Sequence, residues 1–105
     1  LETMAPLAAR CELVPYVKRN LHEQGGCFEG YLPGQTRPHA GLGRSAIQKE
    51  FCDWVVDDSI SDAGWYSGYE IEDEVRARER AAEVVRWLET LDQHADHQRV
   101  ALVIH

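Results

Sequence analysis

The side chains in this sequence best suited to chemistry are an imidazole and a carboxylate. His105 follows the apolar run 100–104, and Glu23 stands within 21–30, a stretch that carries three glycines. An imidazole and a carboxylate held close together can share proton transfer and charge stabilisation in phosphoryl or acyl transfer. We therefore predict that Glu23 and His105 are the catalytic pair.

The run 100–104 predicts the strand that would position His105. It is rich in Val and Ile and has no polar alternation, which is typical of a parallel strand covered on both faces. Ligands of such sheets bind beyond the carboxyl ends of the strands, where His105 would lie. A second short strand is expected within 12–17, and the loop 21–30 that follows it would bring Glu23 to the same edge.

Three helices are expected around these strands. One covers residues 1–10, and a capping box at 45–48 predicts another from Ser45 to about Trp54. A second capping box at 67–70 predicts a long helix that ends near His94, with acidic residues in its first turns. Its apolar stripe is expected to consist of Val75, Ala81, Ala82, Val85, Leu88 and Leu91. Its solvent-facing side is expected to carry Arg76, Arg78, Arg80 and Glu83.

The order strand, crossover, helix, strand predicts an α/β fold. A chain of 105 residues is one domain at most and is small for a complete doubly wound sheet. We therefore expect residues 1–105 to form one partial domain, an incomplete three-layer α/β/α sandwich with a mostly parallel sheet.

Composition excludes several classes of partner. The net charge is −7, from 11 Lys and Arg against 18 Asp and Glu, which disfavours nucleic acid and anionic membrane surfaces as partners. Hydrophobic residues make up 44% of the chain and charged residues 28%, as in ordinary soluble globular proteins.

Cys11, Cys27 and Cys52 are odd in number and have no CxxC spacing, so we expect buried free thiols and a cytoplasmic location.

The remaining polar residues give weaker signals. His94 and His97 have the spacing of two ligands but no third ligand near them, so no metal site is expected. His22 and His39 are lone loop histidines and are expected at the surface. No serine stands in a nucleophile-elbow motif, so the sequence does not support serine-hydrolase chemistry.

Several stretches occur in an order that resembles a known family. They are Leu21-His22-Glu23 leading to Glu29-Gly30, then the long arginine-bearing helix 70–88, then 100–105. Together they resemble the histidine phosphatase (phosphoglycerate mutase-like) superfamily. Residues 1–8 look like the helix that follows the early phosphate-binding arginine of that family. The resemblance spans nearly the whole chain and the later half of such a domain.

The resemblance implies an activity and a set of site residues. It implies hydrolysis or transfer of phosphomonoesters through a phosphohistidine, without metal or other cofactor, on a small phosphorylated metabolite. Glu23 would protonate the leaving oxygen, and His105 would be the second histidine, which stabilises the transferring phosphoryl group. The loop 31–44 would shape substrate specificity. Arg44 at its end would bind the substrate together with Trp65 and Tyr66.

The sequence also departs from the family pattern. The nucleophilic histidine of the Arg-His-Gly motif, the first strand and the arginine before residue 1 are not in this sequence, and the interval from Glu23 to Glu29 is one residue shorter than in the commonest members. We expect the missing elements to come from the rest of a longer parent chain or from a partner chain. The alternative is a catalytically inactive interaction or structural module with the same fold.

Overall fold

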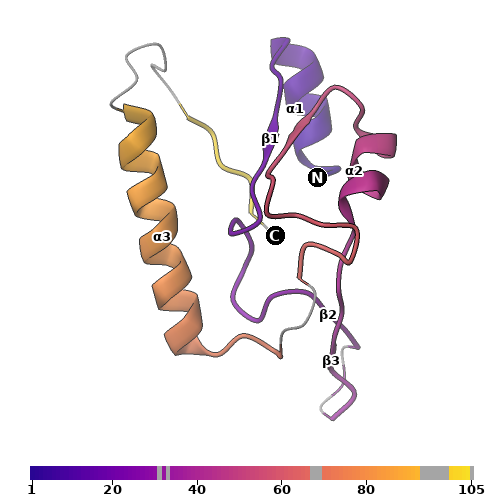
Figure 1. The fold of residues 1–105 in the computed structure, drawn as a ribbon, viewed down its shortest axis with the longest axis vertical. Coiled ribbons are helices and arrows are strands. Elements are labelled where there is room, and N and C mark those ends of the chain that lie inside the picture. The colour runs from indigo at the N-terminus through magenta and orange to yellow at the C-terminus, as the bar shows by residue number, and fades with distance from the viewer. Residues whose placement is uncertain (31, 33, 67–69, 93–99, 105) are drawn as a thin grey trace.

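Helices and short strands alternate along the chain, and the α/β class predicted from the sequence is confirmed. The computed structural model describes residues 1–30, 32, 34–66, 70–92 and 100–104. The elements, labelled in Figure 1, are α1 (Met4–Cys11), β1 (Tyr16–Val17), β2 (Phe28–Glu29), β3 (Arg37–Pro38), α2 (Arg44–Glu50), β4 (Val55–Val56) and α3 (Glu74–Asp92).

The described strands form two small sheets. β1 pairs in parallel with β4, with Tyr16 opposite Val55 and Val17 opposite Val56. β2 and β3 form an antiparallel pair. Because these sheets have two strands each, the expected three-layer sandwich with a mostly parallel sheet stays a prediction.

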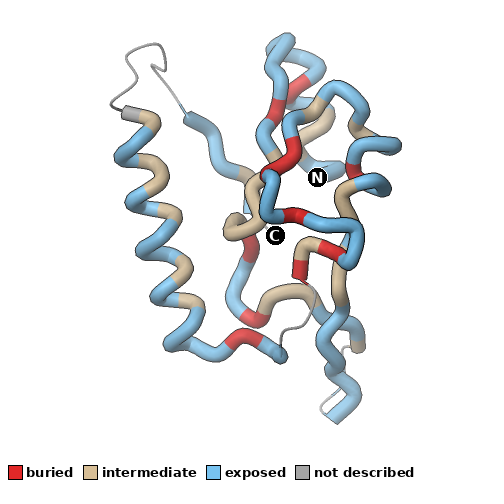
Figure 2. The backbone as a smooth tube through the Cα atoms, in the orientation of Figure 1, coloured by how far each residue is buried: buried red, intermediate tan, exposed pale blue. Residues whose placement is uncertain are grey.

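A small core lies beside the parallel pair. Ile47 of α2, Val56 of β4 and Ile60 are buried, and half-buried hydrophobic residues pack against them. In Figure 2 the buried segments lie mainly in the part of the molecule that holds β1, α2 and β4, whereas no described residue of α3 is buried. The core therefore fixes β1 and β4, and α3 is held mainly by other contacts.

Helix α2 differs from its predicted form. It begins at Arg44 with Gly43 as N-cap, and it ends at Glu50 rather than near Trp54. The predicted Ser45 capping box does not form, because the Ser45 N–H is inside the helix and donates to the Asp62 carboxylate at 2.7 Å. A side chain from a distant loop thus replaces the local cap, which sequence spacing could not reveal.

Helix α3 begins later than predicted and presents a different stripe. Asp73 caps it, accepting a hydrogen bond from the Arg76 N–H at 2.9 Å, and the predicted cap at 67–70 falls partly outside the described residues. Val75 and Val85, expected on the apolar stripe, are exposed. The less exposed residues follow helical spacing, namely Ala77, Arg80, Val84, Trp87, Leu88 and Leu91. The predicted stripe is therefore confirmed at Leu88 and Leu91 and wrong at Val75, Ala81, Ala82 and Val85.

The prediction of a strand over 100–104 is wrong. These residues carry no strand pairing, and Val100, Leu102 and Ile104 are 50, 38 and 42% exposed. An extended segment becomes a strand only when a neighbour supplies the partners for its N–H and C=O groups, and no described strand lies in register with it. In Figure 1 the segment passes between α3 and β1.

The three cysteines are free, as predicted, but Cys11 and Cys52 are exposed rather than buried. Among the described residues, no helix combines the length and the apolar character needed to cross a membrane.

Candidate functional site

A broad hollow of about 860 Å³ lies between β1, α2, α3 and the segment 100–103. Most of its wall is apolar, and two basic residues that follow β1, Lys18 and Arg19, enter it with His22. A concave, mainly apolar space with a few convergent polar groups is the usual form of a ligand site. This space, called the hollow below, is therefore the candidate site.

Lys18 and Asp57 meet at the carboxyl ends of the parallel strands. Each directly follows its strand, and Lys18 Nζ donates to Asp57 Oδ2 at 2.9 Å. The Ser59 N–H and hydroxyl donate to Asp57 Oδ1 at 3.0 and 2.8 Å. Burial raises the pKa of Asp57, but these hydrogen bonds and the Lys18 charge outweigh burial and lower the pKa to about 2. The edge at which α/β sheets bind ligands thus carries an ionised pair.

Arg44, predicted to bind substrate, bonds to the same loop. Its Nη1 donates to the Asp57 carbonyl oxygen at 3.0 Å, and its Nη2 donates to the exposed Asp58 carboxylate at 3.2 Å. Arg44 is not among the residues that line the hollow. These contacts tie α2 to the loop after β4, and the role of Arg44 toward a substrate stays a prediction.

His22 was expected at the surface, and the structure corrects this: the residue is buried, with 8% exposed. Its ring centroid lies 5.1 Å from that of Trp65 and 5.6 Å from that of Tyr66. Nδ1 lies 2.9 Å from the Glu23 carbonyl oxygen, which can only accept, so Nδ1 carries the proton. Burial lowers the pKa of His22, which keeps the ring neutral at pH 7 and leaves Nε2 as an acceptor.

Trp65 and Tyr66 support His22 from one side. Their ring centroids lie 5.3 Å apart, and the Tyr66 hydroxyl donates to the Glu70 carbonyl oxygen at 2.9 Å. Trp65 lines the hollow, whereas Tyr66 lies behind His22 and is buried. Gly26 lies so close to Tyr66 that a Cβ there would come within 2.0 Å of the ring. The aromatic pair is therefore fixed in place by its neighbours.

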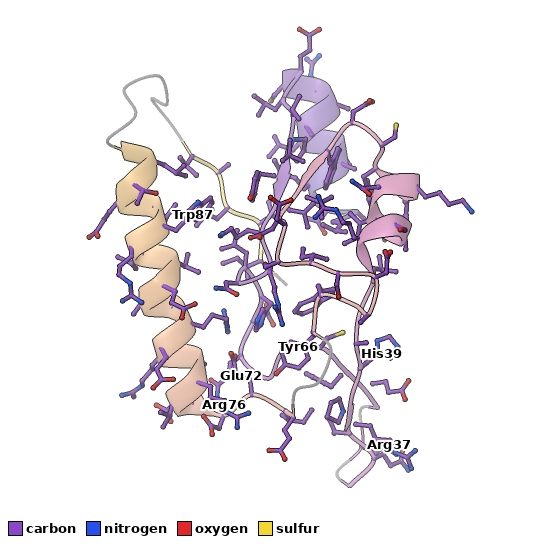
Figure 3. All side chains as sticks on the ribbon, viewed as in Figure 1. Arg37, His39, Tyr66, Glu72, Arg76 and Trp87 are labelled. Atoms are coloured by element: carbon purple, nitrogen blue, oxygen red, sulfur yellow. The ribbon has the colours of Figure 1, made fainter. Side chains whose placement is uncertain are left out.

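A buried ion pair holds the turn that carries His22. Arg80 Nε and Nη2 donate to Glu72 at 2.8 and 2.7 Å, and Arg80 Nη1 donates to the carbonyl oxygens of Asn20 and His22 at 3.0 and 2.9 Å. The Arg80 and Glu72 side chains are only 15 and 7% exposed. Figure 3 shows Glu72 near the start of α3, close to Tyr66. Arg80 thus connects α3 to the loop after β1.

Glu23, the predicted acid/base, stands on this same turn. It is exposed, and its carboxylate makes no hydrogen bond or ion pair within the described residues. Its carbonyl oxygen accepts from His22 Nδ1 and from the Gly26 N–H. The backbone of Glu23 is therefore held while its side chain faces solvent, next in sequence to the hollow-lining His22.

The other predicted catalytic residue, His105, lies outside the described residues. The chain just before it is described, and residues 100–103 line the same hollow as Lys18, Arg19 and His22. The meeting of Glu23 and His105 therefore stays a prediction. The structure does bring the segment that leads to His105 to the hollow's wall.

The sequence analysis missed four charged residues around the site: Lys18, Asp57, Glu72 and Arg80. Arg80 was expected on the solvent-facing side of its helix, because an arginine in a helical pattern is usually solvated. One signal was available for Lys18 and Asp57, since each directly follows two residues that favour strands, and parallel strands end at the same sheet edge. No comparable signal marks Glu72 or Arg80.

Among the described residues, no three His, Cys, Asp or Glu side chains are close enough together to hold a metal ion. Cys27 Sγ lies 3.9 Å from His39 Nδ1, and burial raises the pKa of the Cys27 thiol, so the thiolate is disfavoured.

Comparison of the chain with protein-family models, with curated proteins and with solved structures found no match.

Proposed function

We propose that this chain is the later part of a phosphomonoester phosphatase or mutase that acts through a phosphohistidine on a small phosphorylated substrate. The observation that carries the proposal is the turn 21–23 at the carboxyl edge of β1. Leu21 and His22 of this turn line the hollow that also contains Lys18 and Arg19, and the next residue, Glu23, has an exposed carboxylate with no partner among the described residues. The proposal rests on this geometry together with the resemblance of the stretches 21–30, 70–88 and 100–105 to the histidine phosphatase superfamily.

Each residue has a defined part in the proposed reaction. A histidine nitrogen from the chain before residue 1 attacks phosphorus, the P–O bond to the substrate breaks, and Glu23 gives its proton to the leaving oxygen. Water then attacks the phosphohistidine, Glu23 takes the proton of that water, and phosphate leaves. His105 donates to the equatorial oxygens, where negative charge is spread during phosphoryl transfer.

Hydrogen bonds hold the backbone of the turn that carries Glu23, and this favours the role proposed for Glu23. A general acid must be held within hydrogen-bond reach of the leaving oxygen. His22 and Arg80 hold the backbone of the turn through hydrogen bonds to the carbonyl oxygens of Glu23 and His22, while the Glu23 carboxylate keeps no other partner among the described residues. The turn is thus rigid where rigidity is needed, and its carboxylate is available.

A second candidate is the inactive interaction module. The observation that favours it is the exposure of apolar side chains beside the parallel pair, where Leu13, Val14 and Val55 are 54, 67 and 48% exposed. Exposed apolar patches of this kind commonly mark protein-binding surfaces. This candidate predicts no phosphatase activity in the complete protein.

The test uses the complete natural protein that contains these residues, with 4-nitrophenyl phosphate as substrate. We expect turnover that a chelator does not change and an acid-labile phosphoenzyme after rapid quenching. His105→Ala should lower kcat by about a hundredfold or more, the usual effect of losing a donor to the transition-state oxygens. Turnover that a chelator abolishes, or turnover unchanged in His105→Ala, would contradict the proposal.

A further inference from the structure

We infer that the hollow selects phosphomonoesters whose organic group is apolar and flat, an aryl or arylalkyl group, over small phosphates that carry a second negative charge. This inference rests on the proposed function, because it names the substrate class of the same site.

The basic groups of the hollow are gathered at one place. Lys18 and Arg19 are consecutive, and no other lysine or arginine lines the hollow in the part of the chain that the structure describes. Lys18 is already paired with Asp57, and Arg19 Nε donates to the Trp65 carbonyl oxygen at 3.0 Å. One phosphoryl group can approach these cations, but a second anionic group on the substrate would find no further basic side chain.

Elsewhere the hollow is apolar or acidic. Beyond the basic pair its wall includes Val17, Leu42 and Phe51, and the only charged residues there among those described are Glu2 and Glu50. The wall also holds the hydroxyls of Thr3 and Tyr16, but a carboxylate or second phosphate placed against it would lose hydration without meeting a cation. An apolar group would gain free energy by leaving water. The distribution of charge therefore favours a phosphate joined to an apolar group.

Trp65 gives the hollow a flat, rigid surface next to the cations. The Trp65 backbone N–H donates to the Leu42 carbonyl oxygen at 3.1 Å, and the Trp65 backbone carbonyl oxygen accepts from Arg19 Nε. A Cβ at Gly41 would lie 2.1 Å from the Trp65 indole nitrogen, so the indole leaves no room there for a side chain. A planar group can stack on such a fixed ring at little cost in conformational entropy.

The test compares two non-hydrolysable phosphonates on the complete protein by calorimetry. 2-Phenylethylphosphonate and 2-carboxyethylphosphonate share the phosphonate and the two-carbon chain, and differ in a phenyl group against a carboxylate. We expect the phenyl compound to bind at least about tenfold tighter, the discrimination typical of an apolar pocket, with a negative heat-capacity change. Equal affinity, or tighter binding of the carboxylate compound, would overturn the inference.

A pair of glycine variants tests the role of Trp65. Gly41 and Gly34 both have left-handed backbone, with φ of +71° and +79°, but a Cβ at Gly34 meets no atom within 4 Å. Gly41→Ala should therefore displace the indole and remove most of the preference for the phenyl compound, whereas Gly34→Ala should keep it. A preference that survives in folded Gly41→Ala would contradict the role given to Trp65.

The two proposals can fail separately. If the protein hydrolyses 4-nitrophenyl phosphate but shows no preference for the phenyl phosphonate, the substrate class is wrong and the proposed function stands. If the protein has no phosphatase activity, the proposed function fails whatever the phosphonates do. If neither phosphonate binds, the inference about the hollow is overturned directly.

Discussion

Replacing Arg80 by Met tests whether the buried ion pair holds the loop after β1. Arg80 makes two hydrogen bonds to Glu72 and one each to the carbonyl oxygens of Asn20 and His22. Methionine keeps the aliphatic part of the side chain and removes all four hydrogen bonds. It also leaves the Glu72 carboxylate, with 7% of its side chain exposed, without its cation.

The expected loss is large because a buried charge remains unpaired. Removing one partner of a buried ion pair usually lowers the free energy of unfolding by about 3–5 kcal/mol, and we expect about 4 kcal/mol here. The same helix offers a matched control in Arg78, which pairs with Glu74 four residues earlier while both side chains are largely exposed. Arg78→Met should cost no more than about 0.5 kcal/mol.

The effect of Arg80→Met should depend on pH. Hydrogen bonds from Arg80 lower the pKa of Glu72 below its ordinary value of 4.5, so the pair stabilises the fold above that pH and its contribution is lost as pH falls through the lowered pKa. In the variant the lowering by Arg80 is gone and burial is the largest remaining influence, so the pKa of Glu72 rises and acid relieves the unpaired charge. The difference between the two proteins should therefore be largest near pH 7 and shrink toward pH 3.

Urea unfolding, followed by tryptophan fluorescence at several pH values, measures both effects. Arg80→Lys provides a milder variant if Arg80→Met does not fold, because lysine keeps the charge but cannot make the forked contact with Glu72. Equal losses in Arg80→Met and Arg78→Met at pH 7, or a loss that does not change with pH, would refute the role given to the pair.

Three further predictions concern the elements around the hollow. Asp57→Asn should lower stability by about 1–2 kcal/mol at pH 7 and by less as pH falls toward the native pKa of about 2, because the ionised Asp57 stabilises the fold above its unfolded pKa; urea titrations at both pH values check this. Gly26→Ala should lower stability by about 2 kcal/mol more than Gly34→Ala, since both pay for left-handed backbone but only the former meets the Tyr66 ring; equal melting temperatures would contradict it. Asp73→Ala should cost about 1 kcal/mol and Asp73→Ser only a few tenths, measured by thermal unfolding, because serine can still cap α3.

The sequence predicted where the helices lie better than it predicted which residues cap them or pair with the strands. The helices at 1–10, near Ser45 and toward His94 all exist, because each is long enough for propensity and spacing to decide. Their caps were missed or misplaced, since Asp62 reaches α2 from another loop. The segment 100–104 has the composition of a strand but forms none, because pairing depends on a neighbour that local sequence cannot supply.

The same holds for the site, where some residues could be predicted from the sequence and others could not. Trp65 could be picked out from its size and type, and it does line the hollow. The catalytic role predicted for Glu23 from its glycine-bearing turn stays a prediction. His22, Glu72 and Arg80 could not be picked out, because Arg80, which pairs with Glu72, is held by the carbonyl oxygens of Asn20 and His22, 60 and 58 positions away. Polar residues are usually exposed, so only a structure can show that these three hold one another in place.

The measurement that most directly tests the proposed function is the dependence of Glu23→Gln on the leaving group. If Glu23 protonates the leaving oxygen, the variant should lower kcat/KM about a hundredfold or more for an alkyl phosphate and only about threefold or less for 4-nitrophenyl phosphate, whose leaving group needs no proton. The ratio kcat/KM is compared because it reports formation of the phosphohistidine and not its later hydrolysis, in which Glu23 acts on both substrates alike. Glu29→Gln, a second exposed glutamate of the same region, should affect neither substrate. Equal loss on both substrates, or no loss on either, would contradict the role of Glu23.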